Sequence, residues 1–297
     1  MSERSPSKAW NNGRIVSSSE LCVSVDDAGF RQGVIAVERL RTYDGRVTSL
    51  QPHIVRWRRT LEELYLTVPV DLEDLRHRIT QLLSENNDFL RTNHDCGIVM
   101  LATPGILTLG SSTTASSGDA NEILHLSTLN HDLIARHRNE GQPMFVTDVE
   151  QPSGKCWPRD IKVRCRLHYY LADQQARQHH HAAVGLLIDH DGTVTETSVA
   201  NIAIIRDGCV VSPPIDQVLP GVTQQLVMDA CQVNGIRWVY ERLWPAEIRE
   251  ADEVWLMGTD GGLWFANRVD GSSIGDARPG RIYTKILAEF DRLVRSR

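Results

Sequence analysis

Apolar and polar positions alternate with a period of two near the start of the chain. The stretch GRIVSSSELCVSV predicts short strands joined by a turn. Further on, RLRTYDGRVTSL predicts a β-hairpin about Asp44-Gly45, because these two residues tolerate the positive φ angles of a tight hairpin turn. Residues 1–11 show no comparable pattern, and we expect them to form a disordered lead-in.

A helical period follows the hairpin. Apolar residues spaced by three and four predict one helix over about residues 53–66 and a second over residues 72–83. Asp71 precedes the second helix and is a candidate N-cap. Two apolar strands, CGIVMLAT and EILHLSTL, come next. The low-complexity segment GSSTTASSGDAN lies between them and is expected to be a flexible loop.

After about residue 130 the pattern changes. A polar stretch with a short helix, HDLIARHRNEGQ, is typical of a connector, and strands and helices alternate beyond it. Helices are predicted in LHYYLADQQARQH, with Leu167, Tyr170, Leu171 and Gln174 on one face, in TQQLVMDACQVNG, closed by Gly235, and in RIYTKILAEFDRLVRS. Residues 183–214 predict two or three strands with Asp-Gly turns, and ADEVWLMGTD predicts a buried strand. The fold class is α+β, with a small N-terminal domain over residues 1–130 and a larger C-terminal domain over residues 131–297.

Composition limits the possible partners and compartment. The formal net charge of −6 provides no basic surface for nucleic acid. No apolar run is long enough to cross a bilayer, and the polar N-terminus does not look like a signal peptide. The six cysteines lack CxxC spacing, which favours reduced thiols in a cytoplasmic protein. Three adjacent histidines, residues 179–181, cannot all face one ion, so we expect no metal site.

Lys162 is unusual in this chain. Only four of its 32 basic residues are lysines, and this one lies in RDIKVR, a short strand or strand end just before a predicted helix. A surface lysine in water is the ordinary interpretation. A desolvated lysine amine can instead attack a carbonyl and form a Schiff base. Arginine could not replace it in that role, because the guanidinium stays protonated.

Three downstream segments support the second interpretation. Glu196 lies among apolar neighbours in GTVTETSVANIAII and could be a carboxylate that faces a cationic partner rather than water. VLPGVT places Val222 and Thr223 at the start of a helix, where free N–H groups suit a phosphate, although a simple turn and N-cap would look the same. The strand EVWLMGTDGG ends in small residues that permit close approach of a ligand to the backbone.

The order and spacing of HIVRW, IKVRCRLHYYLADQQA, DGTVTETSVANIAII, VLPGVT and ADEVWLMGTDGG resemble the class IV (fold-type IV) pyridoxal-phosphate enzymes. This family contains branched-chain aminotransferases, D-amino acid aminotransferases and aminodeoxychorismate lyases. The resemblance extends from about Gly13 to the C-terminal helix. It implies a small N-terminal α/β domain, a larger barrel-like C-terminal domain, pyridoxal 5′-phosphate as cofactor, amino acid and 2-oxo acid substrates, and a homodimer.

The resemblance also implies roles for individual residues. Lys162 matches the lysine that forms the Schiff base and moves the proton, and Glu196 matches the carboxylate on the pyridine nitrogen. Arg56 matches the arginine that binds the phosphate. The remaining cofactor contacts are expected at Val199, Leu219, Val222, Thr223, Thr259 and Asp260.

Several positions depart from the family pattern. Gly33-Val34-Ile35 replaces Gly-Asp-Gly, Gln224 stands where an arginine is usual, and Asp260 stands where a small or hydroxyl residue is usual. These changes affect substrate-facing positions more than cofactor contacts. An aminotransferase is the first hypothesis. A lyase that removes pyruvate from aminodeoxychorismate and a non-catalytic descendant are the alternatives, and the choice between D- and L-amino acids stays open.

Overall fold

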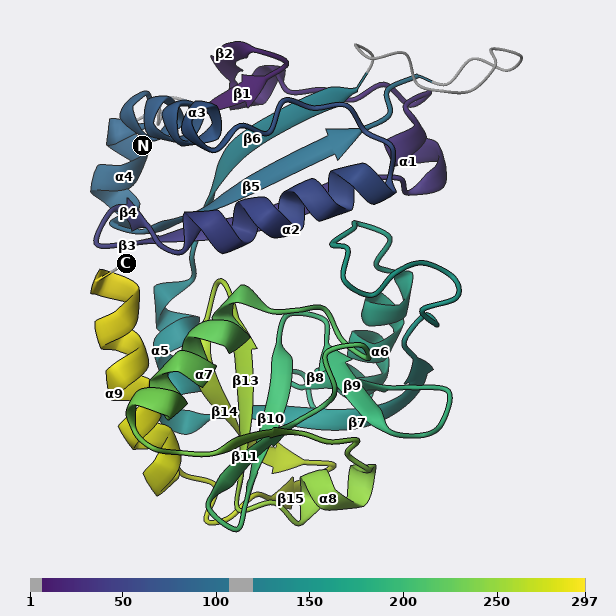
Figure 1. Cartoon of the computed structure of the whole chain (residues 1–297), viewed down its shortest axis with the longest axis vertical. Helices are drawn as coiled ribbons and strands as arrows, with labels where there is room; N and C mark the ends of the chain where they lie inside the picture. Colours follow the sequence, from purple (N-terminus) through teal and green to yellow (C-terminus); the bar gives the residue numbers. More distant parts are fainter. Residues whose placement is uncertain (1–6, 107–119, 297) are drawn as a thin grey trace. The chain divides into compact units, whose positions relative to one another are not determined.

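The computed structural model describes residues 7–106 and 120–296. The chain divides into two compact units. Unit 1 is Met1–Leu129 with Ile161–Cys165, and unit 2 is Asn130–Asp160 with Arg166–Arg297. The short segment that carries Lys162 therefore belongs to unit 1, although the residues on both sides of it belong to unit 2. Helices and a sheet occur in both units, which confirms the predicted α+β class (Figure 1).

Unit 1 contains a sheet with the strand order β2-β1-β6-β5-β3-β4. All of its pairings are antiparallel. The strands are β1 (Lys8–Asn11), β2 (Arg14–Ser17), β3 (Ala36–Tyr43), β4 (Arg46–Val47), β5 (Cys96–Thr103) and β6 (Asn121–Thr128). The predicted hairpin is confirmed, since Thr42 pairs with Val47 and both Asp44 and Gly45 have positive φ. The predicted loop over residues 110–121 lies almost wholly outside the described residues.

The expectation of disorder over residues 1–11 is wrong for Lys8–Asn11, which form β1. This strand pairs with β2 on one side and with β6 on the other, so its backbone groups gain partners that the local sequence does not reveal. Ala9 is fully buried, and Trp10 packs against the hydrophobic core of unit 1. Long-range pairing overrides the polar character of the segment. Residues 1–6 lie outside the described part.

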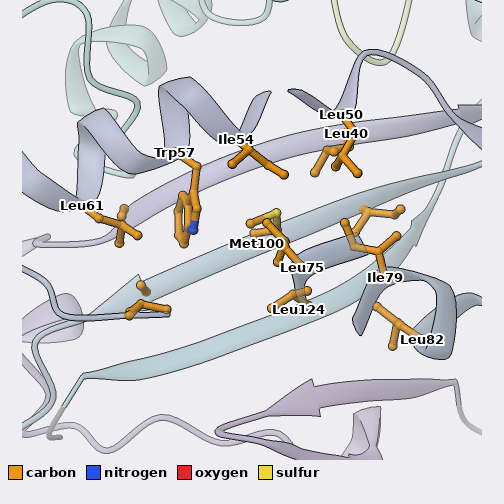
Figure 2. Close-up of a cluster of buried hydrophobic side chains, with 14 of the residues drawn as sticks. Leu40, Leu50, Ile54, Trp57, Leu61, Leu75, Ile79, Leu82, Met100 and Leu124 are labelled. Carbon is orange, nitrogen blue, oxygen red and sulfur yellow. The ribbon is translucent and has the colours of Figure 1, made fainter. Parts of the chain in front are cut away.

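The helices of unit 1 supply one side of its core. They are α1 (Ala28–Gln32), α2 (Leu50–Glu63), α3 (Leu72–Ser84) and α4 (Asn87–Asn93), and a 3-10 turn covers Ser18–Glu20. Helix α2 starts three residues earlier than predicted, because Pro52 is tolerated in a first helical turn, and it ends before Tyr65, which has positive φ. Figure 2 shows Ile54, Trp57 and Leu61 of α2 lining the same cluster as residues of α3 and of the sheet.

Asp71 caps α3 as predicted. Its carboxylate accepts hydrogen bonds from the backbone N–H groups of Glu73 (2.9 Å) and Asp74 (3.1 Å). We expect Asp71→Ala to lower the free energy of unfolding of unit 1 by about 1 kcal/mol, because two N–H groups lose their acceptor. Urea denaturation followed by circular dichroism measures this loss. Asp71→Asn, which keeps a capping oxygen, should lose much less; an equal loss in both variants would contradict the capping role.

Unit 2 contains a larger sheet with the strand order β12-β11-β10-β13-β14-β7-β8-β9, and β15 pairs with β14. Figure 1 shows this sheet curled into a half-barrel, in agreement with the predicted barrel-like domain. The strands are β7 (Gln142–Glu150), β8 (Val184–Ile188), β9 (Val194–Thr197), β10 (Asn201–Arg206), β11 (Cys209–Ser212), β12 (Trp238–Tyr240), β13 (Glu253–Gly258), β14 (Gly262–Val269) and β15 (Ser272–Ser273).

Several features of this sheet differ from the sequence prediction, and strands β12, β14 and β15 are among those that are not predicted. Residues 183–214 form four strands, β8 to β11, rather than two or three. Strand β7 follows the polar connector and is not predicted, yet it lies inside the sheet and pairs in parallel with both β14 and β8. Its sequence mixes apolar and charged residues and provides only a weak two-residue alternation. The pairing of β7 comes from its neighbours, which are distant in sequence.

The structure describes five helices in unit 2, and all of them except the short Pro245–Arg249, which is not predicted, follow the predicted segments closely. They are α5 (His131–Glu140), α6 (Leu167–His179), α7 (Val222–Val233), α8 (Pro245–Arg249) and α9 (Arg281–Ser296). Gly235, with φ of 67°, follows the C-cap of α7 as predicted. Helix α6 packs on β7 and β8 through Ala172 and Ala176, whereas Leu167, Tyr170 and Leu171 are exposed. Across the described residues, none of the helices combines the length and the apolar character that a membrane crossing needs.

Candidate active site

Lys162 lies in a segment that unit 1 fixes by backbone hydrogen bonds. The Lys162 N–H donates to Thr60 Oγ1 on α2 (3.0 Å), and its carbonyl accepts from the Val37 N–H on β3 (3.0 Å). A single antiparallel bridge joins Val163 to Ala36, and the Arg164 N–H donates to the Ile35 carbonyl (3.0 Å). The predicted strand is thus a one-residue bridge. These bonds fix the backbone from which the lysine side chain leaves.

Arg56, the predicted phosphate ligand, is buried beside the Lys162 segment. Thr60 links the two, because its hydroxyl accepts from Lys162 N–H and donates to the Arg56 carbonyl (3.0 Å). The Arg56 guanidinium donates to both oxygens of Glu38, at 3.0 and 2.7 Å. His53 Nδ1 lies 3.0 Å from the same carboxylate. Two residues predicted to serve one cofactor therefore meet in unit 1.

The charges in this cluster favour an ionised Glu38. Burial acts to raise the pKa of Glu38, but the charge of Arg56 and the hydrogen bonds from Arg56 and His53 overcome that effect and hold the pKa well below its usual range. Burial lowers the pKa of His53, and the positive charges of Arg56 and Lys162 act in the same direction against the pull of Glu38. His53 is therefore neutral at pH 7, and Glu38 balances the fixed charge of Arg56.

Glu196, at the end of β9 in unit 2, has a buried carboxylate that accepts hydrogen bonds from four groups. Tyr169 Oη donates to Oε1 at 2.5 Å, and Gln151 Nε2 donates to the same oxygen at 3.3 Å. Asn201 Nδ2 and the Leu219 N–H donate to Oε2 at 3.0 and 3.2 Å. These four groups are donors, which suits an ionised carboxylate because that form only accepts. Its orientation is fixed from both sides.

Asn201 joins Glu196 to the segment that leads into α7. Its side-chain amide donates to Glu196 and also to the Leu219 carbonyl (2.8 Å). A Cβ atom on Gly221 would lie 2.0 Å from Asn201 Oδ1, so only glycine permits this approach. The N-cap of α7 is Gly221, which has no side chain to accept from the first N–H groups, and Val222 and Thr223 begin the helix. The uncapped N–H groups provide a site suited to an anion.

The turns at the ends of β9 and β13 lie side by side. Strand β10 pairs with β13 in a register that places Asn201 opposite Met257. Gly258 and Thr259 come directly after Met257 in the chain. The Val199 carbonyl lies so near Gly258 that a Cβ there would be 2.3 Å from its oxygen. Thr259 and Asp260 form the turn between β13 and β14. Val199 and Thr259, both predicted cofactor contacts, are thus brought to one edge of the sheet.

Gly258→Ala is expected to lower the free energy of unfolding of unit 2 by about 1–3 kcal/mol, because the new methyl group must displace the Val199 backbone. Urea denaturation measures the loss. Gly154→Ala is the matched control, since a Cβ at Gly154 meets nothing within 4 Å. A Gly258→Ala protein as stable as this control would show that the turns at Val199 and Thr259 are not closely packed.

The predicted site residues fall into two groups. Unit 1 holds Lys162 and Arg56, and unit 2 holds Glu196, Val199, Leu219, Val222, Thr223, Thr259 and Asp260. Sequence reasoning misses the residues that orient these groups: Glu38 and His53 in unit 1, and Gln151, Tyr169 and Asn201 in unit 2. Asn201 carries a usable signal, since it begins the strand that follows Glu196. Gln151 carries none, because the strand before it is not predicted.

Residues 36–269 match the family described as amino-transferase class IV. The chain belongs to this family, and the matched residues include both the Lys162 segment and the Glu196 cluster. It is an aminotransferase, and the family and enzyme class predicted from the sequence are confirmed. The D-alanine aminotransferase of Staphylococcus epidermidis (strain RP62A) is 26% identical over 292 residues, which are 97% of this chain and 98% of that protein.

Solved structures confirm the fold. The branched-chain amino acid aminotransferase of Escherichia coli superposes with a TM-score of 0.86 at 22% identity, covering 97% of this chain and 95% of that chain. A second branched-chain amino acid aminotransferase, solved with pyridoxamine 5′-phosphate, has a TM-score of 0.86 at 22% identity, covering 98% and 95%. That of the archaeon Thermoproteus uzoniensis, solved with norvaline, has a TM-score of 0.82 at 24% identity, covering 97% and 94%. The predicted fold-type IV architecture is therefore correct.

Proposed function

We propose that this chain uses pyridoxal 5′-phosphate to move an amino group between an amino acid and a 2-oxo acid, with Lys162 as the catalytic lysine. The observation that carries the proposal is the Glu196 carboxylate, which is buried, acceptor-only and oriented by four donors. Such a carboxylate suits a protonated ring nitrogen. A buried charge held this way needs a reason beyond stability, since folding alone does not require it.

The chemistry of the site residues fits this cofactor. The Oγ of Ser198 and the Oε1 of Gln151 are buried with no hydrogen-bond partner in the described residues. Gln151 donates to Glu196 through its Nε2, and Ser198 follows Glu196 by two residues. Orphaned polar atoms of this kind are uncommon and suit a polar ligand. The uncapped N-terminus of α7 suits a phosphate. A lysine, a carboxylate and an anion site are the three parts that pyridoxal phosphate needs.

The proposal gives each residue a role. When bound, the cofactor supplies an aldehyde and an electron-withdrawing ring that stabilises negative charge at the substrate α-carbon. Lys162 would hold the bound cofactor through its amine and, with that amine free, would carry the proton at the substrate α-carbon. Glu196 binds the ring nitrogen and keeps it protonated. Leu219 packs against the ring.

The phosphate is assigned to residues of several elements. Arg56 would donate to it from α2, the N–H groups of Val222 and Thr223 would donate from α7, and Val199 and Thr259 would contact it from their turns. Asp260 is expected to turn away from the phosphate or to bind a cationic group of the substrate, because a carboxylate beside a phosphate is repelled. Arg56 can serve this role while it pairs with Glu38, since a guanidinium has five N–H donors.

Steady-state kinetics with D- and L-amino acids test the activity. D-alanine is tried first, because D-alanine aminotransferases match nearly the full chain at 25–26% identity. We expect product formation to depend on an added 2-oxo acid and to show ping-pong kinetics. Turnover of aminodeoxychorismate without any 2-oxo acid would favour the lyase alternative. A protein that takes up pyridoxal phosphate but transforms no amino donor would favour the non-catalytic descendant.

The assignments of domain, assembly and compartment are part of the same proposal. We assign the positioning of Lys162 and the phosphate contact of Arg56 to the small domain over residues 1–130, and the remaining cofactor contacts to the larger domain over residues 131–297. A homodimer is supported by the exposed apolar face of α6, formed by Leu167, Tyr170 and Leu171, which light scattering can test. A cytoplasmic location is supported by the cysteines, all six of which are described and free.

A further inference from the structure

One hydroxyl group approaches Glu196 more closely than the other three donors of its cluster. Tyr169 Oη lies 2.5 Å from Glu196 Oε1, against 3.0–3.3 Å for the others. This distance is typical of a charge-assisted O–H···O⁻ bond. Tyr169 lies in the first turn of α6, so the helix fixes the hydroxyl relative to the carboxylate. The contact lies wholly within unit 2.

The surroundings keep Tyr169 a donor. Burial and the negative charge of Glu196 raise the pKa of Tyr169 well above its usual value, so the phenol holds its proton at neutral pH. Gln151 Nε2 donates to Tyr169 Oη at 3.3 Å, which leaves the hydroxyl proton to Glu196. The Arg166 guanidinium lies over the Tyr169 ring, 4.6 Å from its centroid, and its positive charge acts against this rise in the pKa without reversing it.

The other ionisable groups near this pair do not compete for its proton. His168 stacks at a tilt on Tyr169, with 4.0 Å between ring centroids, and burial together with Arg166 lowers the pKa of His168 to about 4. His168 is therefore neutral at pH 7. Arg159 interacts electrostatically with Glu196, but its guanidinium donates two hydrogen bonds to the carboxylate oxygens of Asp189, at 2.7 and 2.8 Å. Arg166 also donates to the Ser198 carbonyl, which ties the start of α6 to the turn after Glu196.

Glu196 and the ring nitrogen of the cofactor share one proton. We propose that the hydrogen bond from the Tyr169 hydroxyl to Glu196 keeps this proton on the ring nitrogen. The proposal rests on the proposed function. A hydrogen bond donated to a carboxylate stabilises its ionised form and so weakens its hold on a proton. Two positions are open to the shared proton, an N–H bond on the ring or an O–H bond on Glu196, and no other reactant is needed. Tyr169 is thus a positioning residue that acts through Glu196.

The test uses holoenzyme loaded with pyridoxal phosphate that carries ¹⁵N in the ring, observed by ¹⁵N nuclear magnetic resonance. Glu196→Gln supplies the reference signal for a ring nitrogen without its proton. In Tyr169→Phe we expect the signal to move toward that reference, because the proton equilibrium shifts roughly tenfold to a hundredfold toward Glu196. Tyr170→Phe is the matched control, since Tyr170 is the next residue, is exposed and should leave the signal unchanged.

A second substitution strengthens the hydrogen bond to Glu196 instead of removing it, and it keeps the fold. Incorporation of 3-fluorotyrosine at position 169 retains the ring and the hydroxyl but makes the hydroxyl a stronger donor, so the signal should move away from the Glu196→Gln reference or stay at the protonated limit. Cofactor that binds with the same ¹⁵N signal in wild type and Tyr169→Phe would overturn the proposal. A shift toward the reference in the fluorotyrosine protein would overturn it as well. Wild-type protein that binds no pyridoxal phosphate would instead overturn the proposed function.

Discussion

Lys162→Arg is expected to abolish transamination, with a loss in kcat of at least about 10³–10⁴-fold. The substitution keeps a positive charge, but a guanidinium stays protonated and cannot attack the cofactor aldehyde or move the proton. The hydrogen bonds that join Lys162 to Thr60 and Val37 use its backbone, so the segment should remain in place. Initial rates with saturating cofactor, amino acid and 2-oxo acid measure the loss.

Lys155→Arg is the matched control. Lys155 is one of the other three lysines, is exposed, and lies seven residues before Lys162 in the same stretch of chain. The control should keep its full rate, and both variants should unfold within a few degrees of the wild type. A Lys162→Arg protein that is folded and turns over at more than a few per cent of the wild-type rate would show that another group performs the chemistry.

Glu196→Gln is expected to lower kcat by about 10²–10³-fold, because the ring nitrogen loses the negative charge that keeps it protonated. The amide also places an NH₂ group among four donors, so one hydrogen bond at least becomes a donor–donor contact. This contact should lower the free energy of unfolding by about 1–3 kcal/mol. Stopped-flow kinetics at saturating cofactor separate the loss in kcat from weaker cofactor binding.

Glu250→Gln is the control for the same chemical change at an exposed site after α8. It should alter neither rate nor stability. Glu196→Asp provides a second comparison, since it keeps the charge but withdraws the carboxylate by one methylene, and we expect an intermediate rate. Equal activity of the wild type and Glu196→Gln would contradict the role assigned to this carboxylate.

Much of the fold can be predicted from local pattern. Helices α3, α6 and α9 agree with their predicted segments within a residue or two, because their periodicity and end signals lie in the sequence itself. Strands β1 and β7 cannot be predicted in this way. Both are polar or mixed in sequence, and their pairing depends on strands that are distant in the chain. The local sequence determines the secondary-structure preference of a segment, but it does not show the distant strand whose pairing overrides that preference.

The candidate site likewise contains some residues that the local sequence predicts and others that only the tertiary structure reveals. The rarity of lysine points to Lys162, and apolar neighbours point to Glu196, but the groups that orient them depend on tertiary approach. The apolar pattern of α6 favours a face with Leu167 and Leu171, which are exposed in the structure, while the helix packs through small alanines. Only the tertiary structure reveals that the Tyr169 hydroxyl of α6 donates to Glu196 of β9.

The most direct test of the account is borohydride reduction of the purified protein after addition of pyridoxal phosphate, followed by peptide mass spectrometry. The account predicts a visible absorption band that bleaches on reduction and one phosphopyridoxyl adduct, on Lys162. Lys155, Lys8 and Lys285 should stay unmodified when free cofactor is removed first. An adduct on another lysine, or a protein that remains colourless and unmodified, would contradict the assignment of Lys162 as the cofactor lysine.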